Sequence, residues 1–245
     1  MTDKNIGANI GVNIGVVGLG AMGRGMASSL RRAGWNVHVC DVRPEAAQAF
    51  AADGGVACAS PAELAAHCEV IVSVVVNAAQ TEDVLFGAHG AAAAMRPGSL
   101  FVMCSTVDPN WSVQLEGRLA AQGVLYLDAP ISGGAAKAAS GEMTMMTAGT
   151  PAAYAKAGKA LDAMAAKVYR LGDTAGNGSK VKIINQLLAG VHIAAAAEAM
   201  ALGLREGVEA SALYEVITNS AGNSWMFENR MAHVLAGDYT PLSAV

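Results

Sequence analysis

The residues with the clearest capacity for chemistry lie in a glycine-rich loop that reads GLGAMG over residues 18–23. The loop follows the apolar run IGVV and opens a helical pattern. In that position Gly18 permits a tight turn, Gly20 lets the backbone approach a pyrophosphate, and Gly23 permits close helix packing. The free N–H groups at the helix N-terminus attract the anion. The sequence therefore predicts a dinucleotide-binding loop, whose candidate contacts are Gly18, Leu19, Gly20, Ala21, Met22 and Gly23.

An acidic residue, Asp41, ends the next apolar run, 23 residues after Gly18. A carboxylate there can accept hydrogen bonds from the ribose hydroxyls of adenosine, and it repels a 2′-phosphate, so the sequence favours NAD over NADP. Arg43 can weaken this discrimination. A helix cap ahead of Pro44 is the alternative role for Asp41. The candidate cofactor contacts here are Asp41, Val42 and Arg43.

Two further apolar runs end in candidate cofactor contacts. One run ends in Val75, Val76 and Asn77, and the other ends in Ser105 and Thr106. Because ligands of parallel sheets bind at the carboxyl ends of the strands, we expect Val75, Val76, Asn77 and Thr106 to line the cofactor site. A simple helix start ahead of Pro109 is the alternative for Thr106.

A second glycine-containing turn, Ser132, Gly133 and Gly134, precedes the helical stretch AAKAAS. Consecutive glycines before a helix expose backbone N–H groups that can hold a carboxylate. We therefore expect these three residues to bind an acidic substrate at the same edge of the sheet.

A helix predicted after residue 179 places Lys182, Asn185 and Gln186 on one face, at spacings i, i+3 and i+4. An amine there can remove a hydroxyl proton, or polarise a carbonyl as a cationic acid. The helix N-terminus and burial lower the pKa of Lys182, whereas a bound carboxylate raises it, so the net direction is open. The alternative is a solvated lysine at the loop, as we expect for Lys180.

The elements that must position these residues alternate between β-branched runs and alanine-rich helical stretches from Asn13 to Thr147. This alternation is typical of a parallel sheet with helices on both faces. After the turn-rich segment 172–179 the pattern is helical only. The sequence thus predicts an α/β fold, with a doubly wound Rossmann-type sheet, a long interdomain helix and a smaller, truncated all-α domain. The expected domains are 1–175, which binds NAD, and 176–245, the interdomain helix and partial all-α domain, with a hinge at 176–179.

Strands and helices can be placed from apolar runs, prolines and turn residues. Strands of the main sheet are expected at 14–18, 36–41, 70–76, 99–104, 124–129 and 143–148, and 168–171 is expected to add an edge strand. Helices are expected to begin near Ala21, Pro44, Pro61, Thr81, Pro109, Ala135 and Pro151, several of them with proline in the first turn. The long helix should run from about 180 to about 205, and two more helices should follow it.

Composition excludes several classes of protein. The chain has 245 residues, of which 53% are hydrophobic and 15% charged, so it is not disordered. Its net charge of −4 and the absence of a basic run argue against a nucleic-acid partner. The most apolar stretch, 181–204, carries charged and amide side chains that are costly in a bilayer, so we expect no membrane span. Four cysteines without metal-like spacing, and no secretory signal, favour a metal-free protein of the reducing cytoplasm.

Four motifs in order, GLGAMG, CSTVDP, DAPISGGAAKAASGEM and GNGSKVKIINQ, resemble the β-hydroxyacid dehydrogenase family, which includes 3-hydroxyisobutyrate dehydrogenase. The resemblance covers nearly the whole chain. It implies an NAD-dependent enzyme for a small hydroxy-carboxylic acid, with Lys182 as catalytic residue, Ser132 to Gly134 as the carboxylate loop and Thr106 as a cofactor contact. Val75 and Val76 stand where many relatives have Leu-Pro, and Gln186 where Asn is usual.

The resemblance also implies assembly as a homodimer or homotetramer through the long helix and the helical domain. Family members continue for several dozen residues through a Lys-Asp motif, so we expect this sequence to be a fragment. Three functions stay open: a dehydrogenase of a small polyhydroxy acid, a dehydrogenase of another β-hydroxyacid or semialdehyde such as 3-hydroxyisobutyrate or tartronate semialdehyde, and a non-catalytic dinucleotide-binding protein.

Overall fold

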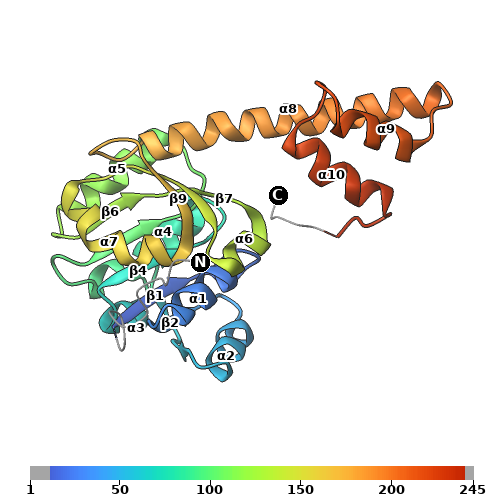
Figure 1. Ribbon diagram of the computed structural model, residues 1–245. Helices are drawn as coiled ribbons and strands as arrows, with labels where there is room; N and C mark the ends of the chain where they lie inside the picture. Colours follow the sequence, from blue (N-terminus) through green and yellow to red (C-terminus); the bar gives the residue numbers. More distant parts are fainter. Residues whose placement is uncertain (1–11, 241–245) are drawn as a thin grey trace. The chain divides into compact units, whose positions relative to one another are not determined.

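The structure is a computed structural model that describes residues 12–240, and the chain divides into two compact units (Figure 1). The first unit extends to Lys182, and the second begins at Ile183. The division falls inside the long helix α8 (Asn177–Arg205). Residues 176–179, expected to form a hinge, instead lead into and form the first turn of this helix.

Six parallel strands form the main sheet of the first unit, in the order β3-β2-β1-β4-β5-β6. This is the strand order of the doubly wound dinucleotide-binding fold, and the order reverses between β1 and β4. Val16 of β1 pairs with Val39 of β2 and Val72 of β4. The strands are β1 (Asn13–Val17), β2 (Asn36–Cys40), β3 (Val56–Ala57), β4 (Val70–Ser73), β5 (Leu100–Met103) and β6 (Leu125–Asp128).

Helices cover both faces of this sheet, as the sequence predicts. Because successive strand residues point to opposite faces, Val16 and Val17 belong to different apolar clusters. The cluster of Val16 includes residues of α1, α2 and α7, and the cluster of Val17 includes residues of α3, α4 and α5. The helices are α1 (Gly23–Arg32), α2 (Pro44–Ala52), α3 (Pro61–His67), α4 (Ala78–Phe86), α5 (Pro109–Ala120), α6 (Gly134–Ser140) and α7 (Pro151–Met164), with a 3₁₀ turn, η2, at Ala92–Ala94.

Local capping explains where these helices begin. Four of them start with proline, as predicted, at a position where its missing N–H leaves no helical hydrogen bond unmade. Helix α4 begins at Ala78 rather than near Thr81, because the side chain of Asn77 accepts a hydrogen bond from the Gln80 N–H at 2.9 Å and so caps the helix earlier.

A second, three-stranded sheet is formed by β7 (Ile131–Ser132), β8 (Met143–Thr147) and β9 (Ala165–Arg170). The sequence placed 143–148 in the main sheet and 168–171 at its edge, and this is wrong. The chain turns at Pro130 and pairs Ile131 antiparallel with Met145. A backbone bridge between Asp128 and Ala148 links the end of β6 to the residue after β8.

The second unit consists of α8 from Ile183 onward, α9 (Ala210–Thr218) and α10 (Trp225–Leu235). Its buried core contains Ala196, Met200, Phe227 and Met231. By length and composition alone α8 could cross a membrane, although one such helix is weak support for a span. His192 is exposed on α8.

Candidate active site

The glycine-rich loop joins β1 to α1 at the point where the strand order reverses. Gly18 has φ +92°, and a β-carbon there would lie 2.6 Å from the Val74 carbonyl oxygen. A β-carbon at Gly23 would overlap the carbonyl oxygen of Gly18. At Gly20 a β-carbon would meet nothing within 4 Å, and no side chain caps α1. Open space therefore faces Gly20 beside a helix N-terminus, which fits a dinucleotide pyrophosphate.

The other three residues of the loop, Leu19, Ala21 and Met22, differ in their exposure to solvent. Leu19 is buried, Met22 is half-buried, and Ala21 is exposed. Their side chains carry no polar group, so each can contact a cofactor only through its main chain or by apolar packing.

Asp41 ties the end of β2 to this loop. Its Oδ2 accepts a hydrogen bond from the Leu19 N–H at 2.6 Å, and its Oδ1 accepts one from the Arg43 N–H at 2.9 Å. The side chain is 6% exposed, whereas Val42 and Arg43 are exposed. Arg43 is the N-cap residue of α2, and no side chain caps that helix, so the alternative role of Asp41 as its cap is wrong.

The segment after β4 is held against the glycine-rich loop. Val75 Cγ1 lies 3.2 Å from the position of a β-carbon on Gly18. The Ser105 hydroxyl donates to the Val75 carbonyl at 2.8 Å, and Gln80 Oε1 accepts the Val76 N–H at 2.9 Å. The side chain of Asn77 is used as the α4 cap, and Thr106 is exposed beyond β5. Sequence reasoning missed the supporting roles of Ser105 and Gln80.

The second glycine turn follows β7 and opens α6. Gly133 has φ +143° and Gly134 has φ +74°, conformations that favour glycine. Ser132 and Gly133 are half-buried, and a β-carbon at Gly134 would meet nothing within 4 Å. The turn is thus open on the side of its second glycine, as a carboxylate-binding loop requires.

Lys182 lies in the second turn of α8, and its side chain is almost completely buried, with 6% of the residue exposed. Within the described residues its amine makes no hydrogen bond or ion pair. Burial therefore lowers the pKa of Lys182, which gives a direction to the shift that the sequence left open. Lys180 is exposed, as expected. Asn185, half-buried, and Gln186, exposed, follow on α8 in the second unit.

One buried carboxylate was missed by sequence reasoning. Asp128, the last residue of β6, is fully buried and accepts hydrogen bonds from the Gly176 N–H at 2.9 Å and the Ser179 N–H at 3.0 Å. An acidic residue that ends an apolar strand was the available signal, but its partners lie about fifty residues later in the chain.

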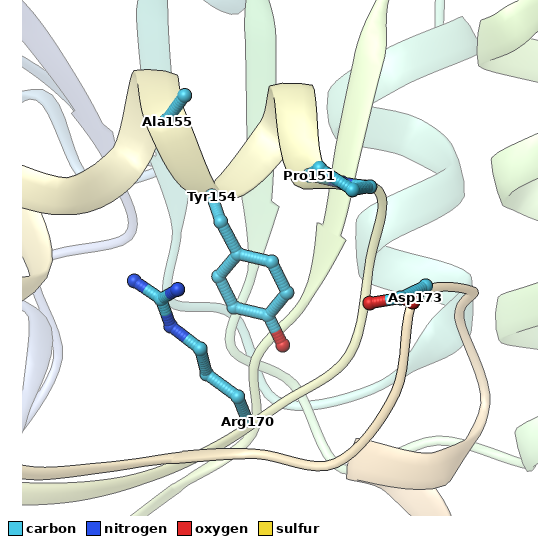
Figure 2. Close-up of a pocket in the computed structure, with 5 residues that line it drawn as sticks. All are labelled: Pro151, Tyr154, Ala155, Arg170 and Asp173. Atoms are coloured by element: carbon cyan, nitrogen blue, oxygen red, sulfur yellow. The ribbon is translucent and has the colours of Figure 1, made fainter.

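A pocket of about 300 Å³ lies at α7 and β9, and its lining includes none of the predicted site residues. The Arg170 guanidinium stacks over the Tyr154 ring, 4.7 Å from the ring centre, and Asp173 lies on the other side of the pocket (Figure 2). The guanidinium is thus engaged with the ring, and a carboxylate already faces this pocket.

Comparison with known proteins agrees with this geometry. Residues 13–172 match the NAD binding domain of 6-phosphogluconate dehydrogenase, and residues 176–245 match the NAD-binding domain of NADP-dependent 3-hydroxyisobutyrate dehydrogenase. The chain is 70% identical to L-threonate dehydrogenase of Cupriavidus necator over 233 residues, which are 95% of this chain and 78% of that protein. It is 48% identical to L-threonate dehydrogenase of Escherichia coli K12 over 234 residues, with 95% and 78% covered.

The fold is shared as well. The crystal structure of 3-hydroxyisobutyrate dehydrogenase from Salmonella typhimurium superposes with a TM-score of 0.90 at 51% identity, covering 95% of this chain and 81% of that one. The glycine cradle, the acidic end of β2 and the strand order are those of an NAD-dependent dehydrogenase. The chain belongs to the β-hydroxyacid (3-hydroxyisobutyrate) dehydrogenase family.

Proposed function

We propose that the protein oxidises L-threonate at C2 to the 2-oxo sugar acid, with NAD as the hydride acceptor. The observation that carries this proposal is Lys182, a buried amine without a polar partner within the described residues. The resemblance of GNGSKVKIINQ to the family's motif implies that this is the catalytic lysine. The high identity to a relative named L-threonate dehydrogenase supports this choice of substrate.

The proposed cofactor contacts share the carboxyl edge of the main sheet. When bound, NAD takes up the hydride from the carbinol carbon. The carboxylate of Asp41 disfavours a 2′-phosphate and so favours NAD over NADP. The proposed contacts are Gly18, Leu19, Gly20, Ala21, Met22, Gly23, Asp41, Val42, Arg43, Val75, Val76, Asn77 and Thr106.

Lys182 is proposed as the proton acceptor. In the oxidative direction its neutral Nζ accepts the proton of the C2 hydroxyl, and in the reverse direction the ammonium returns a proton to the carbonyl oxygen. Burial lowers the pKa of Lys182 and so increases the neutral fraction near physiological pH.

The other proposed substrate contacts are polar groups that suit a hydroxylated acid. The turn at Ser132, Gly133 and Gly134 supplies a hydroxyl and backbone N–H groups for the carboxylate. The amides of Asn185 and Gln186 are proposed to bind the hydroxyl groups. A glutamine at 186 has a longer reach than the family's usual asparagine, which suits a substrate with additional hydroxyls.

Domain roles, assembly and location are proposed together with the reaction. Residues 1–175 would bind NAD, and 176–245 would form the interdomain helix and partial all-α domain. We propose a homodimer or homotetramer, since α8 exposes apolar side chains such as Leu187 and Val191. Four buried free cysteines support a cytoplasmic protein. The net charge of −4 argues against a nucleic-acid partner, and the charged and amide side chains of 181–204 argue against a membrane partner.

Oxidation of C2-deuterated L-threonate tests the reaction. The label should appear in NADH, and label retained in the product would contradict oxidation at C2. Turnover of 3-hydroxyisobutyrate and of tartronate semialdehyde, in its reductive direction, tests the second candidate function, which the Salmonella structure favours. A parallel assay with NADP tests the role of Asp41.

A matched pair of variants tests the catalytic amine. Lys182→Ala should lower kcat by about 10²–10⁴-fold, the usual contribution of a general base. Lys180→Ala, which removes an exposed lysine from the same helix, should leave kcat unchanged. Normal turnover by Lys182→Ala, or NAD binding without turnover in the unmutated chain, would contradict the proposal.

A further inference from the structure

Asp128 is held between the two sheets of the first unit. It ends β6, and its Cα pairs with Met103 of β5 in the main sheet. Its N–H donates to the Ala148 carbonyl at 3.0 Å, and its own carbonyl accepts the Ala148 N–H at 2.8 Å. The backbone of Asp128 is therefore fixed on two sides, and the residue is fully buried.

The side chain of Asp128 interacts with Ser112 of α5 and makes three hydrogen bonds to the start of α8. Oδ2 accepts the N–H groups of Gly176 and Ser179 at 2.9 and 3.0 Å, and Oδ1 accepts the Ser179 hydroxyl at 2.7 Å. The first N–H groups of a helix have no partner within the helix, and a carboxylate there also complements the positive end of the helix dipole. Asp128 thus caps α8 from a distant strand.

The local sequence GNGS permits this close contact. Gly176 has φ +103°, which favours glycine, and its carbonyl accepts the Lys180 N–H at 2.9 Å as the helix begins. A β-carbon at Gly178 would lie 2.5 Å from the Met146 carbonyl oxygen and 3.1 Å from Asp128 Oδ2. Any residue larger than glycine at 178 would push the first turn of α8 away from the carboxylate.

The position of the Lys182 amine depends on the position of the first turn of α8. Lys182 lies one helical turn after Ser179, and within the described residues its amine has no hydrogen bond or ion pair that could fix it separately. The helix backbone therefore sets the position of Lys182, and Asp128 sets the position of the helix backbone. Burial raises the pKa of Asp128, while its hydrogen bonds with Ser179 and Gly176 favour the carboxylate form.

We infer that Asp128 is a positioning residue for the dehydrogenase reaction, which holds the first turn of α8 so that Lys182 meets the substrate hydroxyl. This inference rests on the proposed catalytic role of Lys182. A displacement of about 1 Å at a reacting group can cost about 10²-fold in rate, so loss of the anchor should be visible in kcat.

Asp128→Ala removes the three side-chain hydrogen bonds to Gly176 and Ser179. It should lower kcat by about 10–10²-fold while NAD affinity, measured by calorimetry, stays unchanged. Amide hydrogen exchange over residues 176–182 should become faster. Asp128→Asn should restore most of kcat, because its carbonyl oxygen can accept both N–H groups and its amide can donate to the Ser179 hydroxyl.

A matched control separates positioning from general stability. Ser60→Ala removes the cap of α3, where the serine hydroxyl accepts the Glu63 N–H at 3.1 Å, and α3 carries none of the predicted site residues. It should lower the melting temperature without lowering kcat. A loss of kcat in Ser60→Ala equal to that in Asp128→Ala would overturn the inference.

A double variant tests whether Asp128 acts through Lys182. In a Lys182→Ala background, Asp128→Ala should cost no further activity. A full additional loss, or an unchanged kcat in folded Asp128→Ala, would overturn the inference and leave the proposed function standing. Normal activity in Lys182→Ala alone would overturn the proposed function instead.

If Asp128→Ala does not fold, Ser179→Ala provides the test. A lower kcat together with faster amide hydrogen exchange over residues 176–182 would support a positioning role for Asp128, and an unchanged kcat would overturn it.

Discussion

At the scale of single residues, burial of a charge connects stability with chemistry. Lys182 is 6% exposed and, within the described residues, unpaired, so the fold bears the cost of removing an amine from water. That same burial lowers its pKa, which favours the neutral form that a general base needs. Spacing indicated the helix face of Lys182, whereas the depth of its burial depends on residues distant in sequence and could not be read from the pattern.

Replacement of this lysine by an apolar residue should stabilise the protein while it abolishes turnover. Lys182→Met keeps the long side chain and removes the desolvated amine, so the free energy of unfolding at neutral pH should rise by about 1–3 kcal/mol. Lys180→Met, at an exposed position, should change it little. Denaturant unfolding measures both, and a destabilised Lys182→Met would show that the amine is well solvated.

The stability gain expected for Lys182→Met should depend on pH, because burial lowers the pKa of Lys182. The pKa of Lys182 is lower in the folded protein than its ordinary value of 10.5, so between the two values the unfolded state binds more protons. The cost of burying Lys182 is therefore full below the folded pKa and fades as pH rises towards 10.5. The stability difference between Lys182→Met and the unmutated chain should shrink over that range, and a constant difference would contradict the lowered pKa.

At the scale of elements, the sequence predicted helix starts, which depend on local residues, but it did not predict strand pairings between residues distant in the chain. Prolines at 44, 61, 109 and 151 start four helices where the sequence indicates. The strands β3 and β7 were missed because two residues are too short to show a period of two. The assignment of β8 to a second sheet depends on pairing with Ile131, a contact across the turn and helix that follow β7.

The packing of α1 against α6 gives an element-scale prediction. A β-carbon at Gly25 would lie 2.7 Å from the Ala139 nitrogen, a backbone atom that cannot rotate away. Gly25→Ala should therefore destabilise the first unit by about 1–3 kcal/mol through overpacking. Gly117→Ala is the matched control, since a β-carbon there meets nothing within 4 Å, and it should stabilise α5 by about 0.5–1 kcal/mol.

Thermal unfolding of the two alanine variants measures the difference. Both changes add one methyl group to a helical glycine, so helix propensity is the same and only the contact differs. Equal shifts in melting temperature for Gly25→Ala and Gly117→Ala would contradict the close approach of α1 to α6.

At the scale of the whole molecule, the two units differ in how much core supports them. The first unit packs two apolar clusters against a six-stranded sheet, whereas the second has a core of four buried residues within the described range. The sequence indicated the sheet and the helical portion. The point of division could not be read from it, because α8 continues without interruption from one unit into the other.

This difference predicts separate responses to the loss of a core residue. Phe227 is 3% exposed, lies in the core of the second unit, and its ring stacks on Tyr214 at 5.9 Å. Phe227→Ala should cost about 3–5 kcal/mol, enough to loosen a core of that size. The first unit contains the glycine-rich loop and its own core, so NAD binding should persist while the circular-dichroism signal of the second unit's helices is lost at lower temperature.

Trp225→Ala, at a position 59% exposed, is the control and should leave unfolding nearly unchanged. Calorimetry and NAD titration distinguish the outcomes, and a single transition in which NAD binding is lost together with the second unit would show that the two units fold as one.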